Sequence, residues 1–370
     1  MLLLLYSLKF HRYKRSWILY PEIIPASDKV NIPLSVIIPF RNEASNLPAV
    51  LHALVSQDYP PSLFEVILVN DHSEDDSATV AAGFCLEHAH FMLLHADDRE
   101  KGKKQALMKG IAKAACGYII TTDADCIMPV SWLRTIASTF QQKKADMIIG
   151  LVDISTGTGF LDQFQETEFL SLVASGAGAA ARNHPIYCNG ANFAYTKRVF
   201  YSVADAMKLG IISGDDTLFM HAIKKERSSR ILLLKSRAAV VTTRGLNSCD
   251  QFLQQRRRWI SKSFYYRDRD TIYTALLVLL VNLSLLGSGV MLVIRLNCWL
   301  FPALLATKFF TDVVFLSAFY RYYNKTIPAR RFILYELIYP FYSLFVALLG
   351  LTSGFSWKGR HSGINYPAPT

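Results

Sequence analysis

A stretch of 24 residues, 271–294, contains no charged side chain, and this sets the first limit on the fold. A helix needs about 20 apolar residues to cross the hydrocarbon core of a bilayer, so this stretch is long enough to span a membrane. Residues 297–319 and 332–351 are two further candidates. We therefore expect two or three spans near the C-terminus. The third candidate is interrupted by Pro340 and either crosses the membrane or re-enters it.

The charge of the chain lies beside these apolar segments. Of a net charge of +11, residues 1–20 carry +4 and residues 250–370 carry +9, which leaves −2 for residues 21–249. A nearly neutral central part gives no global electrostatic support for nucleic-acid binding. Because Lys and Arg are enriched in cytoplasmic loops, we expect residues 21–270 and 320–331 to be cytoplasmic. The six cysteines form no C-x-x-C pair, which fits a reducing compartment and gives no sign of a zinc or redox site.

The N-terminus is also apolar. The first eight residues, MLLLLYSL, are too few to cross a bilayer before Lys9. They lack the charged start and the small-residue cleavage site of a signal peptide. The segment is therefore either an interfacial anchor or the remnant of a longer span.

Between these ends, short apolar runs alternate with helical segments. Four runs are expected strands: 34–40, 64–70, 91–95 and 117–122. Three segments are expected helices: 43–56, 75–87 and 103–115. Strands rich in Val and Ile that are separated by helices indicate a parallel sheet with both faces covered. In such sheets ligands bind beyond the carboxyl ends of the strands, which is where the polar clusters of this chain fall.

The strongest of these clusters is the pair Asp123 and Asp125, which follows the fourth expected strand. Side chains alternate along a strand, so two acids at i and i+2 can point the same way. Paired carboxylates suit Mg²⁺ or Mn²⁺ that is held together with substrate phosphates. The alternative is a solvated loop or a helix cap before Pro129.

Two further clusters lie near the expected sheet. Asp71 follows the second strand, where its carboxylate can bind a nucleobase edge or a ribose, or can close an Asx turn with Ser73 or Ser77. The run 99–104 places four basic residues at the start of a helix. These residues, Lys103 among them, either hold a diphosphate or form a solvated charged face.

Two clusters lie further along the chain. Asp215 and Asp216 precede an apolar stretch, and they either complement a helix dipole or supply a general base that reaches an acceptor hydroxyl. Gln255, Arg258 and Trp259 share one helix face through their i, i+3 and i+4 spacing. Trp can stack on a sugar ring and Arg can bind a phosphate through two hydrogen bonds. The alternative is an interfacial helix whose basic residues face anionic lipid.

One charged pair lies inside a candidate span. Lys308 and Asp312 are four residues apart in the second apolar segment, where a helix would bring them together. Charges within a membrane are functional candidates by default, and a structural pair between spans is the alternative.

Taken together, these clusters resemble the family 2 glycosyltransferases, which are inverting enzymes with a GT-A fold. Six motifs occur in the order found in the family: VIIPFRNE (36–43), VNDHS (69–73), KGKKQAL (101–107), DAD (123–125), GDD (214–216) and QRRRW (255–259). The loop NGAN (189–192) also resembles the family's acceptor-side loop. The chain departs from the family at 214–216, where Thr-Glu-Asp or Glu-Asp is frequent, and at Met108, where Asn is frequent.

The resemblance runs from about residue 34 to residue 259 and implies an α/β, Rossmann-like GT-A domain followed by C-terminal transmembrane helices. Together with the hydropathy pattern of the chain, the resemblance indicates five parts. These are a membrane-proximal segment (1–30), the GT-A domain (31–249), an interfacial helix with the Q-x-x-R-W motif (250–270), the transmembrane region (271–354) and a tail (355–370).

The resemblance also implies roles for individual residues. Four residues would line the nucleoside pocket: Pro39, Asn42, Glu43 and Asp71. Lys103 would assist at the diphosphate, Asp123 would approach the ribose or the metal, and Asp125 would bind Mg²⁺ or Mn²⁺. Asp216 would be the catalytic base with Asp215 beside it. Three residues would close over the diphosphate and the acceptor: Gln255, Arg258 and Trp259.

The function implied is a multi-pass enzyme of the cell membrane with a cytoplasmic catalytic domain. It would move a sugar from a UDP- or GDP-sugar to a lipid, lipid-linked or polysaccharide acceptor. Two or three spans are few for a polymer channel, so we favour a single transfer to a lipid-type acceptor over a processive polysaccharide synthase. Another alternative is a catalytically inactive assembly subunit, against which the intact Asp125, Asp216, Arg258 and Trp259 argue. These motifs do not specify the sugar, the acceptor or the oligomeric state.

Overall fold

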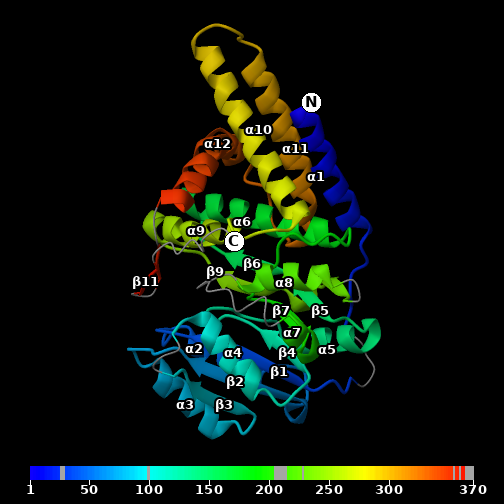
Figure 1. Cartoon of the computed structure of the whole chain (residues 1–370), viewed down its shortest axis with the longest axis vertical. Helices are drawn as coiled ribbons and strands as arrows, with labels where there is room; N and C mark the ends of the chain where they lie inside the picture. The colour runs from blue at the N-terminus through cyan, green and yellow to red at the C-terminus, as the bar shows by residue number, and fades with distance from the viewer. Residues whose placement is uncertain are drawn as a thin grey trace. The chain divides into compact units, whose positions relative to one another are not determined.

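The computed structural model describes residues 1–25, 30–97, 101–203, 215–226, 229–352, 355–357 and 360–362 (Figure 1). By compactness the chain divides into two units. The sheet unit comprises Tyr20–Ser155 and Tyr187–Arg244, and the helical unit comprises Met1–Leu19, Thr156–Ile186 and Gly245–Thr370. Residues 156–186 therefore group with the helical unit, although they lie within the segment 31–249 that the sequence assigns to the GT-A domain.

The sheet unit is built on a seven-stranded sheet with the strand order β3-β2-β1-β4-β7-β5-β8. Its strands are β1 (Leu34–Phe40), β2 (Phe64–Asn70), β3 (Phe91–His95), β4 (Tyr118–Thr121), β5 (Met147–Gly150), β7 (Phe193–Thr196) and β8 (Ile231–Leu234). The predicted strands 34–40, 64–70 and 91–95 are confirmed at both ends, and 117–122 is one residue shorter at each end. All seven residues of β1 are buried, which explains why the strand is an unbroken apolar run.

The prediction of a parallel sheet is correct for only part of it. The first four strands in sequence are mutually parallel where they pair. Strand β7 is antiparallel to both β4 and β5, so the sheet is mixed. The direction of β7 depends on pairing between residues that are far apart in the sequence, such as Thr121 with Phe193, and hydrophobic periodicity carries no information about it.

Helices pack around this sheet. They are α2 (Leu47–Val55), α3 (Ser77–Glu87), α4 (Lys103–Lys113), α5 (Trp132–Lys143), α7 (Lys197–Ser202) and α8 (Asp215–Lys225), with short 3₁₀ turns at Pro61–Leu63 and Arg237–Ala239. Strands β6 (Val152–Ser155) and β9 (Val241–Arg244) form a separate parallel pair. Helix α4 approaches the sheet closely, because a Cβ atom on Gly110 would lie 2.5 Å from Cγ2 of Ile37. The start of α4 lies near the end of β2, where the N–H of Gly102 donates to Oδ1 of Asp71 at 3.1 Å.

The helical unit contains the helices that are candidates for membrane spans. Its helices are α1 (Leu2–Leu19), α6 (Phe160–Ala180), α9 (Cys249–Ser263), α10 (Arg269–Val293), α11 (Leu300–Tyr322) and α12 (Ala329–Thr352), followed by the short strands β10 (Phe355–Trp357) and β11 (Arg360–Ser362). Within the described part of the chain, three helices are long and apolar enough to cross a membrane: Arg269–Val293, Leu300–Tyr322 and Ala329–Gly350. Helix α12 continues through Pro340 without a break.

The N-terminal helix α1 lies beside α10 and α11 (Figure 1). Trp17 stacks on Phe319 with ring centroids 4.5 Å apart, and Phe10 contacts Phe315 edge to face at 5.0 Å. The hydroxyl group of Tyr6 donates to Oδ1 of Asp312 at 2.7 Å. Helix α1 is therefore a packed part of the helical unit, held by aromatic contacts and by a buried hydrogen bond.

Candidate active site

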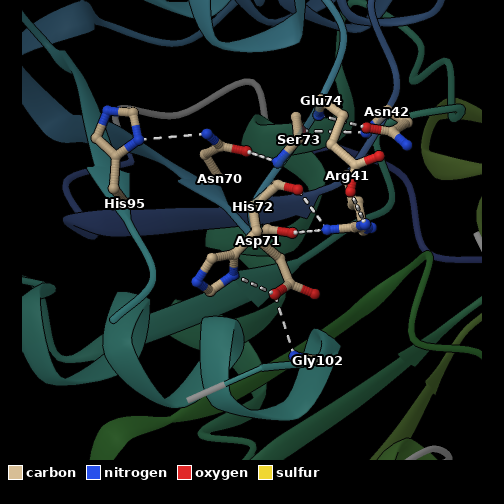
Figure 2. A network of polar contacts seen from close by, with 9 residues as sticks. All are labelled: Arg41, Asn42, Asn70, Asp71, His72, Ser73, Glu74, His95 and Gly102. Atoms are coloured by element: carbon tan, nitrogen blue, oxygen red, sulfur yellow. Dashed lines mark hydrogen bonds and ion pairs between the residues drawn. The ribbon is translucent and has the colours of Figure 1, made fainter. Parts of the chain in front are cut away.

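A buried arginine connects the loops that follow β1 and β2 (Figure 2). Nη1 of Arg41 donates to the carbonyl oxygens of Asp71, at 3.2 Å, and of His72, while Nη2 donates to Glu74 at 2.7 Å. Arg41 is only 6% exposed, so its charge is placed against carbonyl dipoles inside the protein. No role is predicted for Arg41 from the sequence, although its place inside the motif VIIPFRNE (36–43) is a signal for one.

The same two loops contain residues in the left-handed backbone conformation. Asn42 has φ of 49° and His72 has φ of 56°, values that non-glycine residues seldom adopt. Oδ1 of Asn42 accepts a hydrogen bond from the Glu74 N–H at 2.8 Å, and the Asn42 N–H donates to Oγ of Ser73 at 3.1 Å (Figure 2). These cross-loop contacts hold both sharp turns in place.

Asp71 is 2% exposed and points to the start of α4. Its Oδ1 accepts a hydrogen bond from the N–H of Gly102 at 3.1 Å (Figure 2). Gly102 has φ of 113°, a conformation that favours glycine, and it directly precedes Lys103. The Asx-type contact with Ser73 is made by Asn70, whose Oδ1 accepts from the Ser73 N–H at 2.9 Å. Asp71 therefore fixes the glycine that positions Lys103.

The other predicted nucleoside-pocket residues lie at the same edge. Pro39 is buried in β1 opposite Val69 of β2. Glu43 follows β1, its N–H donates to Oγ of Ser77 at 2.7 Å, and its Oε2 accepts from Nδ2 of Asn46 at 2.7 Å. Residues 43–46 form a turn, and α2 therefore begins at Leu47 and not at Glu43 as predicted.

Asp123 and Asp125 lie in a turn and not in a strand. Strand β4 ends at Thr121, and the N–H of Cys126 closes the turn on the carbonyl oxygen of Asp123 at 3.2 Å. The prediction that strand alternation aligns the two acids is therefore wrong. The turn itself brings them together, with the buried Ala124 between them.

The charges around these acids fit a cation site. Asp123 forms an ion pair with Lys103 of α4. Burial raises the pKa of Asp125, and the nearby negative charges of Asp123 and Glu43 raise that pKa further. A divalent cation would offset this repulsion, and carboxylate oxygens are the ligands that Mg²⁺ and Mn²⁺ prefer. No group of three or more His, Cys, Asp or Glu side chains that could hold a metal occurs among the residues that the structure describes. Asp123 and Asp125 would thus need further ligands from substrate phosphates or water.

Asp216 lies in the first turn of α8. Its Oδ2 accepts a hydrogen bond from the N–H of Gly190 at 2.8 Å, and its Oδ1 accepts from the N–H of Thr217 at 2.8 Å. The carbonyl oxygen of Gly190 accepts from Oγ1 of Thr121 at 3.1 Å, so the NGAN loop connects Asp216 to the end of β4. Helix α8 begins at Asp215, whose side chain lies outside the described residues, as does all of Gly214.

The residues of the Q-x-x-R-W motif lie on α9 in the helical unit. Gln255, Arg258 and Trp259 are half-buried, while Arg256 is 3% exposed. Nε of Arg256 donates to both carboxylate oxygens of Glu168 at 3.0 Å. The i, i+3 and i+4 spacing of the motif leaves Arg256 out, whereas the structure places it in the centre of a buried network.

The model of the family "Glycosyl transferase family 2" matches residues 35–203. Glycosyltransferase AglE of Haloferax volcanii is 32% identical over 126 residues, which are 34% of this chain and 41% of that protein. Poly-beta-1,6-N-acetyl-D-glucosamine synthase of Staphylococcus epidermidis is 26% identical over 142 residues, which are 38% of this chain and 33% of that protein. The 4,4'-diaponeurosporenoate glycosyltransferase of Staphylococcus aureus is 34% identical over 101 residues, which are 27% of this chain and 25% of that protein. The chain thus spans less than half the length of these relatives.

A solved structure supports the fold assignment. The mannosyltransferase PcManGT from Pyrobaculum calidifontis, in complex with GDP-Man and Mn²⁺, aligns with a TM-score of 0.54 and 17% sequence identity. The alignment covers 94% of this chain and 94% of that one. At this identity the similarity establishes the fold alone.

Proposed function

Residues 35–203 belong to glycosyl transferase family 2 and have the GT-A fold, and from this we propose that the chain is a membrane-bound inverting glycosyltransferase. It would move a sugar from a UDP- or GDP-sugar to an acceptor at the cytoplasmic face of the cell membrane. One observation carries the proposal. The NGAN loop links the Asp216 carboxylate to the end of β4, directly before the acids Asp123 and Asp125.

The proposed reaction is a single in-line displacement. Asp216 takes the proton of an acceptor hydroxyl as that oxygen attacks the anomeric carbon of the donor sugar. A carboxylate has about four lone-pair positions, so the hydrogen bonds from Gly190 and Thr217 leave acceptor capacity for this proton. The bond to the nucleoside diphosphate breaks, its electron pair leaves with the diphosphate, and the configuration at the anomeric carbon is inverted.

Other residues would hold the donor. The buried loops around Arg41, Asn42 and Asp71 would fix the nucleoside, and Lys103 would face the diphosphate. A divalent cation bound by Asp123 and Asp125 would supply charge neutralisation for the departing diphosphate. Asp215 would support Asp216. Gln255, Arg258 and Trp259 would close over the diphosphate and the acceptor.

The acceptor is proposed to be a lipid or a lipid-linked glycan. Among the residues that the structure describes, three helices could cross a membrane, and the Q-x-x-R-W helix α9 directly precedes the first of them. A processive polysaccharide synthase is the second candidate, which is favoured by the relative named as a polysaccharide synthase. The relative named as a 4,4'-diaponeurosporenoate glycosyltransferase favours a single transfer.

The purified full chain in lipid vesicles tests this proposal. We would supply a panel of UDP- and GDP-sugars with Mn²⁺ or Mg²⁺ and measure release of the nucleoside diphosphate. Release that requires Asp216 and yields one labelled lipid supports a single transfer. A retained long polymer supports the synthase instead. If the folded chain releases no diphosphate from any donor, the result would instead indicate the remaining alternative, a catalytically inactive assembly subunit.

A further inference from the structure

Arg256 is the most completely buried charged side chain of the Q-x-x-R-W helix. It is held by Glu168 of α6 through three hydrogen bonds, two from Nε at 3.0 Å and one from Nη2 at 2.5 Å. The side chains of this ion pair are 4% and 7% exposed. A planar guanidinium that forms several hydrogen bonds to one carboxylate has a fixed orientation, because both groups are rigid forks.

A third helix holds the same carboxylate. The hydroxyl group of Tyr342, on α12, donates to Oε1 of Glu168 at 3.1 Å. Phe164 of α6 and Phe252 of α9 pack with Tyr335 of α12 in one buried cluster. Helices α6, α9 and α12 therefore meet around the ion pair, and the orientation of Arg256 depends on all three.

Arg256 in turn orients its neighbour Gln255. Nη1 of Arg256 donates to Oε1 of Gln255. A guanidinium has donors only, so the atom of the Gln255 amide that faces it must be the carbonyl oxygen. The NH₂ group of Gln255 is then the end turned away from Arg256, where it is a donor suited to a phosphate or to a sugar oxygen.

Arg256 also orients Trp259. The guanidinium carbon lies 4.3 Å from the ring centroid of Trp259 and 4.3 Å from that of Phe252. A cation at this distance from an aromatic ring is attracted to the ring face. The position of the Trp259 ring is therefore coupled to the same ion pair.

We propose that Arg256 is a positioning residue for transfer. Held by Glu168 and Tyr342, it presents the NH₂ group of Gln255 as a donor and sets the ring of Trp259. The inference rests on the proposed function, which places Gln255 and Trp259 at the diphosphate and the acceptor. It adds a residue that touches neither substrate, and it connects the membrane helix α12 to the reaction.

The test compares Arg256→Lys with Arg257→Lys, the same substitution at the adjacent arginine, in the full chain in lipid vesicles. Lysine keeps the positive charge but lacks the planar guanidinium that forms several hydrogen bonds to one carboxylate. A small misplacement of positioning groups costs up to about 100-fold in rate, so we expect Arg256→Lys to lower kcat by about 10- to 100-fold. We expect the donor KM to change less than about twofold, because the nucleotide would be bound by other residues. Glu168→Gln should reproduce the loss, and it serves as the second variant if Arg256→Lys does not fold.

Two further measurements separate positioning from a general structural role. If Arg256 acts through Gln255, the fold reduction of kcat in the double variant Gln255→Ala/Arg256→Lys should be smaller than the product of the fold reductions in the two single variants. Trp259 fluorescence, obtained as the difference from Trp259→Phe, should become more accessible to acrylamide in Arg256→Lys and remain unchanged in Arg257→Lys. Multiplicative losses, or unchanged Trp259 accessibility, would overturn the inference. The fluorescence readout does not need turnover, so an inactive wild-type chain would refute the proposed function and leave this test intact.

Discussion

Gly190 donates its backbone N–H to Oδ2 of Asp216 at 2.8 Å, across 26 residues of sequence. The same glycine accepts a hydrogen bond from Thr121 through its carbonyl oxygen at 3.1 Å. One peptide segment thus connects the proposed base to the strand that leads into Asp123 and Asp125. Gly190 uses only its backbone N–H and carbonyl oxygen in these two contacts. Substitution of the Asp216 side chain can therefore remove the carboxylate and leave the donor groups of the loop unchanged.

Replacement of Asp216 by asparagine should slow transfer strongly while the fold is retained. The amide oxygen of asparagine can still accept the Gly190 N–H, but the side chain can no longer take a proton. A positioned general base contributes about 10²- to 10⁴-fold, so kcat for diphosphate release should fall by that factor. Asp97→Asn is the control, since Asp97 is an exposed acid that pairs with Lys109 at 2.9 Å. Wild-type turnover in Asp216→Asn would show that another residue is the base.

Replacement of Asp125 by asparagine should raise the melting temperature and abolish the response to metal. The charged form of Asp125 is disfavoured by burial and by the charges of Asp123 and Glu43, so a neutral amide relieves a cost that the protein bears at neutral pH. We expect an increase of about 1 to 3 °C without metal, which corresponds to less than about 1 kcal/mol. Mn²⁺ with a nucleoside diphosphate should stabilise the wild type and leave Asp125→Asn unaffected. A lower melting temperature in the variant would mean that Asp125 is a structural acceptor.

The strands that the sequence predicts best are short apolar runs bounded by turn residues. β1, β2 and β3 all begin and end at the predicted residues, although β1 is wholly buried and β3 is mostly half-buried. The direction of β7 and the grouping of α6 with the long apolar helices were not predicted. Both depend on contacts between residues distant in sequence, such as Thr167 of α6, whose hydroxyl lies 2.8 Å from that of Tyr320.

For the candidate site, the sequence predicted which acids are candidate functional residues, but it did not predict the hydrogen bonds that hold them in place. Asp71 was predicted from its place after β2, but its hydrogen bond to Gly102 joins residues 31 positions apart. Arg41 and Arg256 were missed for a common reason. Arginine is usually exposed, and nothing in the motif reveals that these two are 6% and 3% exposed.

Gly150 cannot be replaced without loss of stability. A Cβ atom there would lie 2.2 Å from Cγ of Asn192. The Asn192 side chain cannot move away cheaply, because it is 1% exposed and donates to the carbonyl oxygens of Leu151 and Ala239, each at 2.8 Å, while accepting from Trp132 at 3.0 Å. Overpacking combined with lost buried hydrogen bonds should cost about 2 to 4 kcal/mol in Gly150→Ala.

The matched control for that substitution is Gly83→Ala. Gly83 lies inside α3, and a Cβ atom there would meet nothing within 4 Å. Alanine is the better helix former by about 0.5 to 1 kcal/mol, so Gly83→Ala should raise the melting temperature slightly. Thermal unfolding of both variants in the same detergent gives the comparison. Equal melting temperatures would contradict the packing described around Asn192.

Lys308 belongs to a buried cluster of charges in the helical unit, and its role there is either structural or functional. Substitution of Lys308 tests the structural role first. Nζ of Lys308 is 2.7 Å from Oδ2 of Asp312 and 2.6 Å from Oε2 of Glu336 on α12, and its side chain is 2% exposed. Lys308→Met would leave two buried carboxylates without a cation, and removal of one partner from a buried pair costs about 3 to 5 kcal/mol. The yield of folded protein and its melting temperature should therefore fall sharply. Lys109→Ala, which breaks an exposed pair, should change stability by less than about 0.5 kcal/mol.

The triple variant Lys308→Met/Asp312→Asn/Glu336→Gln separates the two roles. It removes all three charges at once, so no carboxylate is left buried without a partner, and most of the lost stability should return. We expect this variant to retain donor turnover, because the three residues belong to a helical cluster with no proposed part in the displacement. Recovered stability with turnover still lost would instead assign the cluster a functional role within the membrane, as intramembrane charges often have.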